Sequence, residues 1–453
     1  MLETLVLAAA LASPPQLVVV PRLDLDAVAP RAAVGWLVPG AGPETSRAIA
    51  LASLERGAVE NSLRGGLPDG APIARVRFAD AVPHEPGVVV LELPEGGRQP
   101  NDRRYPIALT GASGLLGSDA TRIDGLVAVA DVARGKLKTS ASGDPVGTLR
   151  ELDDRIRDNG TARLPGSLLA AAIVVVLAFV RPRAAVAGLA TGALANLLLG
   201  VLGVSTPWVT IPLLALGTLA GLWVAPTAAL LLGTVAAYGV AMAVDASWVA
   251  LSPLGPTQNA RFYGISNLLE TMLLPVALAG AFLLWRRFGA AGLGIAAAVA
   301  LVTVAGSRFG ADAGGAVVLL AGFGVLLAML LPRRLALTAA AALVAVTALA
   351  LVLGPATHLG AADLPGDLWD RVTLSWHRAT DGWTVGIVTV LALGVLAVLV
   401  VRGPKRPLPL AIAAAIAVSM VVNDSPQDVA LGGLVGFLAL ARWDEAHRVP
   451  WER

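Results

Sequence analysis

The chain has 453 residues, of which 56% are hydrophobic and 15% are charged, with a mean hydropathy of +0.73. Soluble proteins carry about 25% charged residues, so most of this chain is not expected to face water. The net charge of +2 argues against nucleic acid as a partner, because that would call for a basic stripe. The absence of cysteine excludes disulfides and Cys-ligated metals. A His-rich zinc site is also unexpected, and we predict no metal ligands. The sequence contains four histidines: His84, His358, His377 and His447.

Residues 1–14 form a segment that is similar to a secretion signal or a membrane anchor. An apolar run over residues 1–12 ends in Ala10-Leu11-Ala12, the A-x-A pattern of a signal cleavage site. The run contains Glu3 and neither Lys nor Arg, which is untypical of a signal. A cleaved signal, an uncleaved anchor and a buried first strand or helix are therefore all open.

Residues 15–164 carry charges every few residues, and their pattern predicts a small α/β domain. A helix is expected from Glu44 to Gly57, and an amphipathic helix from Asp144 to Asn159 leads towards the membrane. Three short continuous apolar runs are typical of strands in a parallel sheet. These runs cover residues 16–21, 88–93 and 126–130.

Two segments of this domain, Val18–Asp26 and Ser118–Val132, carry a family resemblance. They resemble parts of the alkaline-phosphatase-superfamily-like domain that many bacterial envelope proteins fuse to a membrane region. Working phosphatases of that superfamily hold two metals through several Asp and His residues, whereas this domain has one histidine, His84. The resemblance therefore implies a degenerate extracytoplasmic domain with a binding or structural role. Four acidic residues at strand ends are either ligands of one hard cation or turn and cap residues. They are Asp24, Asp26, Asp119 and Asp131.

From residue 165 to residue 442 the charges gather in short clusters between apolar runs, which predicts a helical transmembrane domain. About eleven runs are long enough to cross roughly 30 Å of hydrocarbon. The expected fold class is an α-helical polytopic membrane protein with a small N-terminal α/β extracytoplasmic domain. The runs are 166–180, 184–204, 207–224, 227–244, 268–285, 288–306, 314–331, 335–353, 383–401, 408–422 and 429–441.

The loops between alternate runs carry Lys and Arg, and this pattern predicts the orientation. If every run crosses once, all these positions fall on one side, which is then cytoplasmic together with the tail 443–453. The N-terminal domain and the remaining loops are expected outside the bacterial cytoplasmic membrane. The basic positions are Arg181, Arg183, Arg286, Arg287, Arg333, Arg334, Arg402, Lys405, Arg406 and Arg442.

The outer loops bring Arg, Asp, Glu, Asn and His to one leaflet boundary, which predicts an anion-binding site there. Asn267 and Glu270 are three residues apart and share a helix face. A carboxylate one turn below the interface needs a partner or a wet cavity. We expect Arg261 and Arg308 to pair with Glu270 and Asp312. The alternative is a set of structural ion pairs that only cap helices.

We assign roles to ten residues of these loops. Bidentate guanidinium groups suit phosphate or carboxylate, and Glu, Asp or His suits proton transfer. The predicted catalytic residues are Glu270, Asp312 and His377. The predicted substrate-binding residues are Arg261, Tyr263, Asn267, Arg308, Arg371, Arg378 and Asp424.

Three strings of the membrane half, Gly255–Glu270, Gly310–Gly315 and Asn423–Ser425, are similar to motifs of the same membrane-protein family. The family often has Gly where this chain has Ser266, which leaves the role of Glu270 open. The family implies an architecture and no secure activity. The Asp370–His377 stretch also resembles the outer loop of O-antigen ligases and polymerases, where Arg and His act at a lipid pyrophosphate.

Three hypotheses of function follow from these patterns. The first is an envelope enzyme, transferase-like, that acts on a lipid-linked glycan or a phospholipid at the outer leaflet, with membrane lipids as partners. The second is a lipid or glycan transporter or flippase, which would place ionisable residues along a path through the bilayer. The third is a non-catalytic scaffold that binds envelope proteins through its exported domain.

Overall fold

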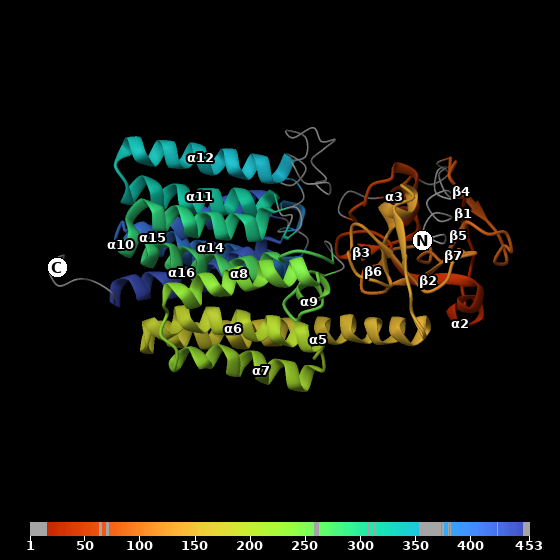
Figure 1. Ribbon diagram of the computed structural model, residues 1–453, viewed down its shortest axis with the longest axis horizontal. Helices are drawn as coiled ribbons and strands as arrows, with labels where there is room; N and C mark the ends of the chain where they lie inside the picture. Colours follow the sequence, from red (N-terminus) through yellow and green to blue (C-terminus); the bar gives the residue numbers. More distant parts are fainter. Residues whose placement is uncertain are drawn as a thin grey trace. The chain divides into compact units, whose positions relative to one another are not determined.

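The computed structural model of the chain divides into two compact units, drawn in Figure 1. Unit 1 comprises Met1–Arg157 and Pro256–Tyr263, and unit 2 comprises Asp158–Gly255 and Gly264–Arg453. The signal-like segment lies outside the residues that the structure describes. The structure describes residues 16–62, 66–68, 72–257, 262–306, 309–310, 313–352, 373, 376–378, 380, 382–423 and 425–446.

Unit 1 is built on a mixed sheet with the strand order β10-β8-β2-β7-β5-β1-β4, in which β9 also pairs with β2. All three predicted apolar runs form strands, and β1 pairs with β5 in the expected parallel direction. However, β7 runs antiparallel between β5 and β2, so the sheet is not purely parallel. The strands are β1 (Gln16–Val19), β2 (Ala32–Val38), β4 (Val76–Phe78), β5 (Val88–Leu91), β7 (Tyr105–Thr110), β8 (Leu115–Ser118), β9 (Leu126–Ala128) and β10 (Leu137–Ser140).

The helix predicted from residue 44 is α3 (Arg47–Arg56), which starts three residues later than expected. Ser46 caps it, because its hydroxyl accepts a hydrogen bond from the Ile49 amide at 3.3 Å. The preceding residues form β3 (Glu44–Thr45), paired with β6 (Gln99–Pro100). Gly57 ends the helix in the left-handed conformation, at φ 63°. The other helices of unit 1 are short: α2 (Leu25–Val28), η1 (Ala29–Arg31) and α4 (Val129–Ala133).

Unit 2 is helical, and each apolar run predicted for it falls on a helix. Among the described residues, four helices are long and apolar enough to cross a membrane: α5, α6, α10 and α14. The apolar helices α7, α8, α11 and α15 are shorter, and the count of about eleven spans is not confirmed. The helices are α5 (Pro145–Val180, which begins in unit 1), α6 (Pro182–Leu202), α7 (Pro207–Leu219), η2 (Ala220–Leu222), α8 (Ala228–Val244), α9 (Ser247–Ala250), α10 (Asn267–Ala305), α11 (Ala313–Leu330), α12 (Arg333–Val352), α14 (Trp383–Arg402), α15 (Pro407–Val422) and α16 (Pro426–Ala446).

Helix α10 is a hairpin of two helices that reverses at Gly289. The backbone of Gly289 has φ 59° and ψ −140°, a conformation outside the helical region that glycine adopts readily. A Cβ on Gly292 would lie 2.3 Å from the carbonyl oxygen of Leu284. In a straight helix these residues would be about 12 Å apart along the axis. The two predicted runs 268–285 and 288–306 are therefore separate antiparallel helices.

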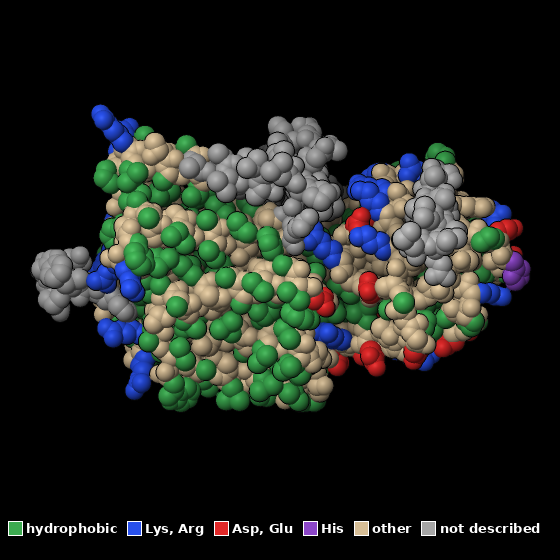
Figure 2. All heavy atoms as spheres, in the orientation of Figure 1, with side chains coloured by type: hydrophobic (Ala, Val, Ile, Leu, Met, Phe, Trp, Pro, Cys, Tyr) green, Lys and Arg blue, Asp and Glu red, His purple; other side chains and the backbone are tan. Residues whose placement is uncertain are grey.

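Basic side chains gather at one end of unit 2, which we call the basic end. Figure 2 shows Lys and Arg there, where α16 ends. Arg442 lies over the Phe179 ring at 5.2 Å, which brings together the last turns of α16 and α5. The guanidinium of Arg406 pairs with Asp444 at 3.2 Å. We call the opposite end, where α10 begins and α15 ends, the polar end.

Candidate functional site

The candidate site is at the polar end and is centred on Glu270, in the first turn of α10. The side chain is buried, and among the described residues of unit 2 it is the only buried carboxylate. Asn423, which ends α15, donates from Nδ2 to Oε2 of Glu270 at 2.9 Å. The same amide donates to the hydroxyl of Ser419 at 2.7 Å. Glu270, Ser419 and Asn423 together form what we call the Glu270 cluster.

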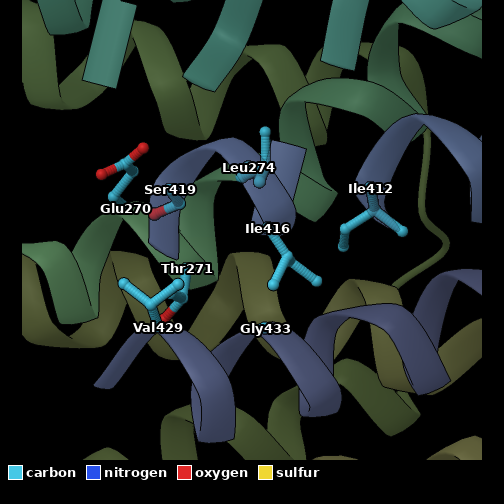
Figure 3. A pocket seen from close by; sticks show the side chains of 8 residues that line it. All are labelled: Glu270, Thr271, Leu274, Ile412, Ile416, Ser419, Val429 and Gly433. Atoms are coloured by element: carbon cyan, nitrogen blue, oxygen red, sulfur yellow. The ribbon is translucent and has the colours of Figure 1, made fainter. Parts of the chain in front are cut away.

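A small cavity adjoins the Glu270 cluster, between α10, α15 and α16 (Figure 3). It has room for about one water molecule. Most of its wall is apolar, and Glu270 and Ser419 are the members of the cluster that line it. A lipid headgroup does not fit inside it. The lining residues are Glu270, Thr271, Leu274, Ile412, Ile416, Ser419, Val429 and Gly433.

The walls of this cavity approach closely because α16 carries glycines on the face towards α10 and α15. A Cβ on Gly433 would lie 2.8 Å from the side chain of Ile416. A Cβ on Gly432 would lie 2.2 Å from the Thr271 hydroxyl. Small residues let helix backbones pack closely in a membrane. These glycines therefore fix the distance between α16 and the Glu270 cluster.

Two arginines bring positive charge to the start of α16. Arg378 is half-buried, and its Nη1 donates to the hydroxyl of Ser425, the residue before α16, at 3.2 Å. Arg163 on α5 donates to the carbonyl of Gly255, and Asp428 in the first turn of α16 is close enough to interact with it electrostatically. The N-terminus of a helix also favours negative charge. Asp428 offsets the charge of Arg163 and lies in this favourable first turn, so attraction of a further anion to the start of α16 depends on Arg378.

A buried hydrogen-bond network holds the start of α10 in place. Asn196 is fully buried, and its Oδ1 accepts from the amide of Leu254 at 2.8 Å. Its Nδ2 donates to the hydroxyls of Tyr238 and Ser252, each at 3.0 Å. Ser266 donates to the carbonyl of Leu254 at 2.7 Å and caps α10 by accepting from the Leu269 amide at 3.1 Å. These side chains tie the loop before α10 and the first turn of the helix to the neighbouring helices of unit 2.

The structure describes five of the ten predicted site residues. Glu270 and Arg378 are both at the polar end: Glu270 accepts from Asn423, and Arg378 donates to Ser425, two residues further along the chain. Asn267 is half-buried as the first residue of α10, and His377 is exposed beside Arg378. Tyr263 is buried in unit 1 under the guanidinium of Arg122. The other five lie outside the described residues: Arg261, Arg308, Asp312, Arg371 and Asp424.

Several residues of the site were not predicted from sequence. Asn423 and Ser419 are the described partners in the Glu270 cluster, and Arg163 and Asp428 lie beside the start of α16. The sequence does contain one signal for them. Arg163 is a charge at the very start of an apolar run, and Asn423 directly follows one. Polar residues at such places face a cavity or a partner more often than lipid.

In unit 1, all four acidic residues that could be either cation ligands or cap residues have partners within the protein. Asp24 caps α2, and Asp131 accepts from the Ala120 amide at 2.7 Å. Asp26 pairs with Arg150 and Asp119 with Lys138. These are the contacts of cap and ion-pair residues. Within the described part of the chain, no group of three His, Cys, Asp or Glu could hold a metal ion.

Comparisons with known proteins give no family: no protein-family model, curated protein or solved structure matches the chain.

Proposed function

We propose that the chain is a multi-pass protein of the bacterial cell envelope that binds the phosphate group of a membrane lipid at the polar end of unit 2. The lipid is a lipid-linked glycan or a phospholipid, and the reaction is transferase-like. The observation that carries the proposal is the burial of Glu270, held by Asn423, in an apolar helical unit. A buried ionisable residue in such a unit points to a functional site.

Arg378 is the proposed phosphate ligand. Its guanidinium donates to Ser425, the residue before α16, and the residue is half-buried, at the margin between the buried cluster and the surface. A guanidinium matches phosphate geometry with two parallel hydrogen bonds. The N-terminus of α16 adds backbone amides and a favourable dipole. Phosphate binding at this place needs no rearrangement of the buried cluster.

Glu270 is the proposed general base, acting through water. Its cavity admits about one water molecule and excludes a headgroup, so direct contact with a lipid is ruled out in this conformation. A base can act through one intervening water. Asn423 then orients the carboxylate, because it donates to Oε2 from a fixed position at the end of α15.

The charge distribution supports an outer-leaflet location for the polar end. Lys and Arg gather at the basic end, which the positive-inside rule places in the cytoplasm. The proposed site then faces the outer leaflet, where lipid-linked envelope intermediates are exposed. The apolar stretch of α14 is mostly exposed, which fits contact with lipid tails.

Transport and scaffolding are supported less well by the same observations. A transporter is expected to carry several ionisable groups along a path at mid-depth. In the described part of unit 2, Glu270 is the only buried carboxylate, and it lies at one end. A scaffold that acts through unit 1 gives no reason for a buried, hydrogen-bonded carboxylate in unit 2.

The test is lipid binding by the purified full chain in neutral detergent. Arg378→Gln is compared with Arg402→Gln, which removes the same charge from an exposed residue at the basic end of α14. The ligands are an undecaprenyl phosphate, an anionic phospholipid and diacylglycerol, which lacks phosphate. We expect a loss of roughly 10- to 100-fold in affinity for one phosphate-bearing lipid in Arg378→Gln only, as for a charged hydrogen bond. Equal binding by both variants, or equal binding of diacylglycerol, would overturn the proposal.

A further inference from the structure

Arg122 in unit 1 has an unusual backbone conformation. It is the only residue other than glycine with positive φ among the described residues, at φ 55°. A side chain in the left-handed region is uncommon, and the surrounding structure must hold it there. Such residues concentrate at clamps and switch regions. Contacts of the surrounding residues must therefore stabilise this conformation of Arg122.

The turn that carries Arg122 is held by three buried polar side chains. Asp131 accepts from the Ala120 amide at 2.7 Å, and Ser118 accepts from the Ala128 amide at 3.0 Å. Thr121 donates to the carbonyl of Leu126 at 2.6 Å. This segment resembles part of a phosphatase-like domain, and for Asp131 the sequence left open a cation ligand or a turn or cap residue. Its polar groups instead bind the backbone and fix the turn.

The guanidinium presented by this turn lies over the ring of Tyr263, 4.4 Å from the centroid. Tyr263 is buried. It belongs to Pro256–Tyr263, a segment that is part of unit 1 although it lies between α9 and α10 in the sequence. A cation over an aromatic face is attracted to it, and more strongly when both are shielded from water.

The residue after Tyr263 is constrained equally closely. Gly264 has φ +81°, and a Cβ on it would lie 2.3 Å from the carbonyl oxygen of Gly310. Ser266, two residues later, caps α10, and Glu270 follows in the first turn. Six residues, Gly264 to Leu269, separate Tyr263 from Glu270 in the sequence.

We propose that Arg122 is a positioning residue, and that unit 1 serves to clamp the segment leading into α10 through the Arg122–Tyr263 stack. The clamp holds the beginning of α10 in the register in which Glu270 meets Asn423. This role gives the folded domain of unit 1 a structural task. It goes beyond the proposed lipid site and does not depend on which ligand binds there.

The chain has no cysteine, so a single introduced cysteine reports on one place without background. The probe is Leu268→Cys, half-buried in the first turn of α10, and its maleimide labelling rate is measured in the full chain. The control probe is Phe288→Cys, which is exposed at the tip of the α10 hairpin. Arg122→Gly is the principal variant, because glycine accepts φ 55° without strain and leaves the turn folded.

We expect Arg122→Gly and Tyr263→Leu each to raise labelling of Leu268→Cys by roughly two- to thirtyfold, the range set by the strength of cation–π contacts. The double variant should label no faster than the faster single variant. Tyr263→Phe keeps the ring and should label like the parent, and labelling of Phe288→Cys should not change. Unchanged labelling in Arg122→Gly, or equal effects of Tyr263→Phe and Tyr263→Leu, would overturn the clamp. If Arg122→Gly fails to fold, the two Tyr263 variants decide.

Discussion

Asn423 donates a hydrogen bond to Glu270 at 2.9 Å, although the two residues are 153 positions apart in the sequence. The bond joins the end of α15 to the first turn of α10. Both side chains are buried, so the loss of either leaves a polar group without its usual partner in an apolar surrounding. This bond is therefore expected to be energetically important to unit 2.

Asn423→Ala should destabilise the protein by about 1–3 kcal/mol, because it removes a donor to a buried carboxylate. Ser419→Ala, the matched control, removes only a neutral acceptor of the same amide and should cost about 0.5–1.5 kcal/mol. Thermal unfolding of the purified full chain in detergent measures both. Equal stability of Asn423→Ala and the parent would show that the bond contributes nothing.

The turn of the α10 hairpin should depend on glycine at position 289. Gly289→Ala places a side chain at φ 59° and ψ −140°, which costs of order 1–3 kcal/mol. Gly294→Ala is the control, because a Cβ there meets nothing within 4 Å. It should be neutral or stabilise α10 by up to about 1 kcal/mol through helix propensity. The same unfolding assay separates the two, and a Gly289→Ala protein as stable as Gly294→Ala would contradict the hairpin.

Alkaline pH should weaken unit 1 through Tyr105. Burial raises the pKa of this phenol above its ordinary value of 10.0, with smaller effects from neighbouring charges. The folded chain therefore keeps the proton after the unfolded chain has released it. The stabilisation is complete below about pH 10 and is lost as pH rises through the raised pKa.

Two measurements check the role of Tyr105. The chain has three tyrosines, so the ultraviolet titration of phenolate in the parent minus that in Tyr105→Phe isolates this group. It should titrate above pH 10.0, and the unfolding temperature of the parent should fall more steeply than that of Tyr105→Phe in that range. Titration of Tyr105 at or below its ordinary value would contradict the burial argument.

Local patterns in the sequence predicted much of the fold. Hydropathy predicted two separate runs, 268–285 and 288–306, on either side of the point where α10 reverses. This was possible because the Arg286-Arg287 pair and Gly289 interrupt the apolar sequence within a few residues. The apolar runs of β1 and β5 were likewise recognised as strands. Strand β7 was missed, since its Tyr105-Pro106 start gives no strand signal, and its antiparallel pairing is a long-range property.

The site was predicted only in part, for a similar reason. Spacing along one helix placed Asn267 on the same face as Glu270, whereas the amide of Asn423, at the end of another helix, donates to the carboxylate. Helix periodicity reports which residues share a face and does not report which helices pack together. The role of Arg122 depends on its backbone conformation and on a ring far along the chain, and neither can be read from residue types.

An experimental density map of the full chain, purified with its native lipids, tests the central claim most directly. We predict density for a lipid headgroup within hydrogen-bonding distance of Arg378 and the N-terminus of α16, with Glu270 still bonded to Asn423 behind it. Headgroup density confined to the basic end, beside Arg402 and Arg442, with none at Arg378 would contradict the proposed site.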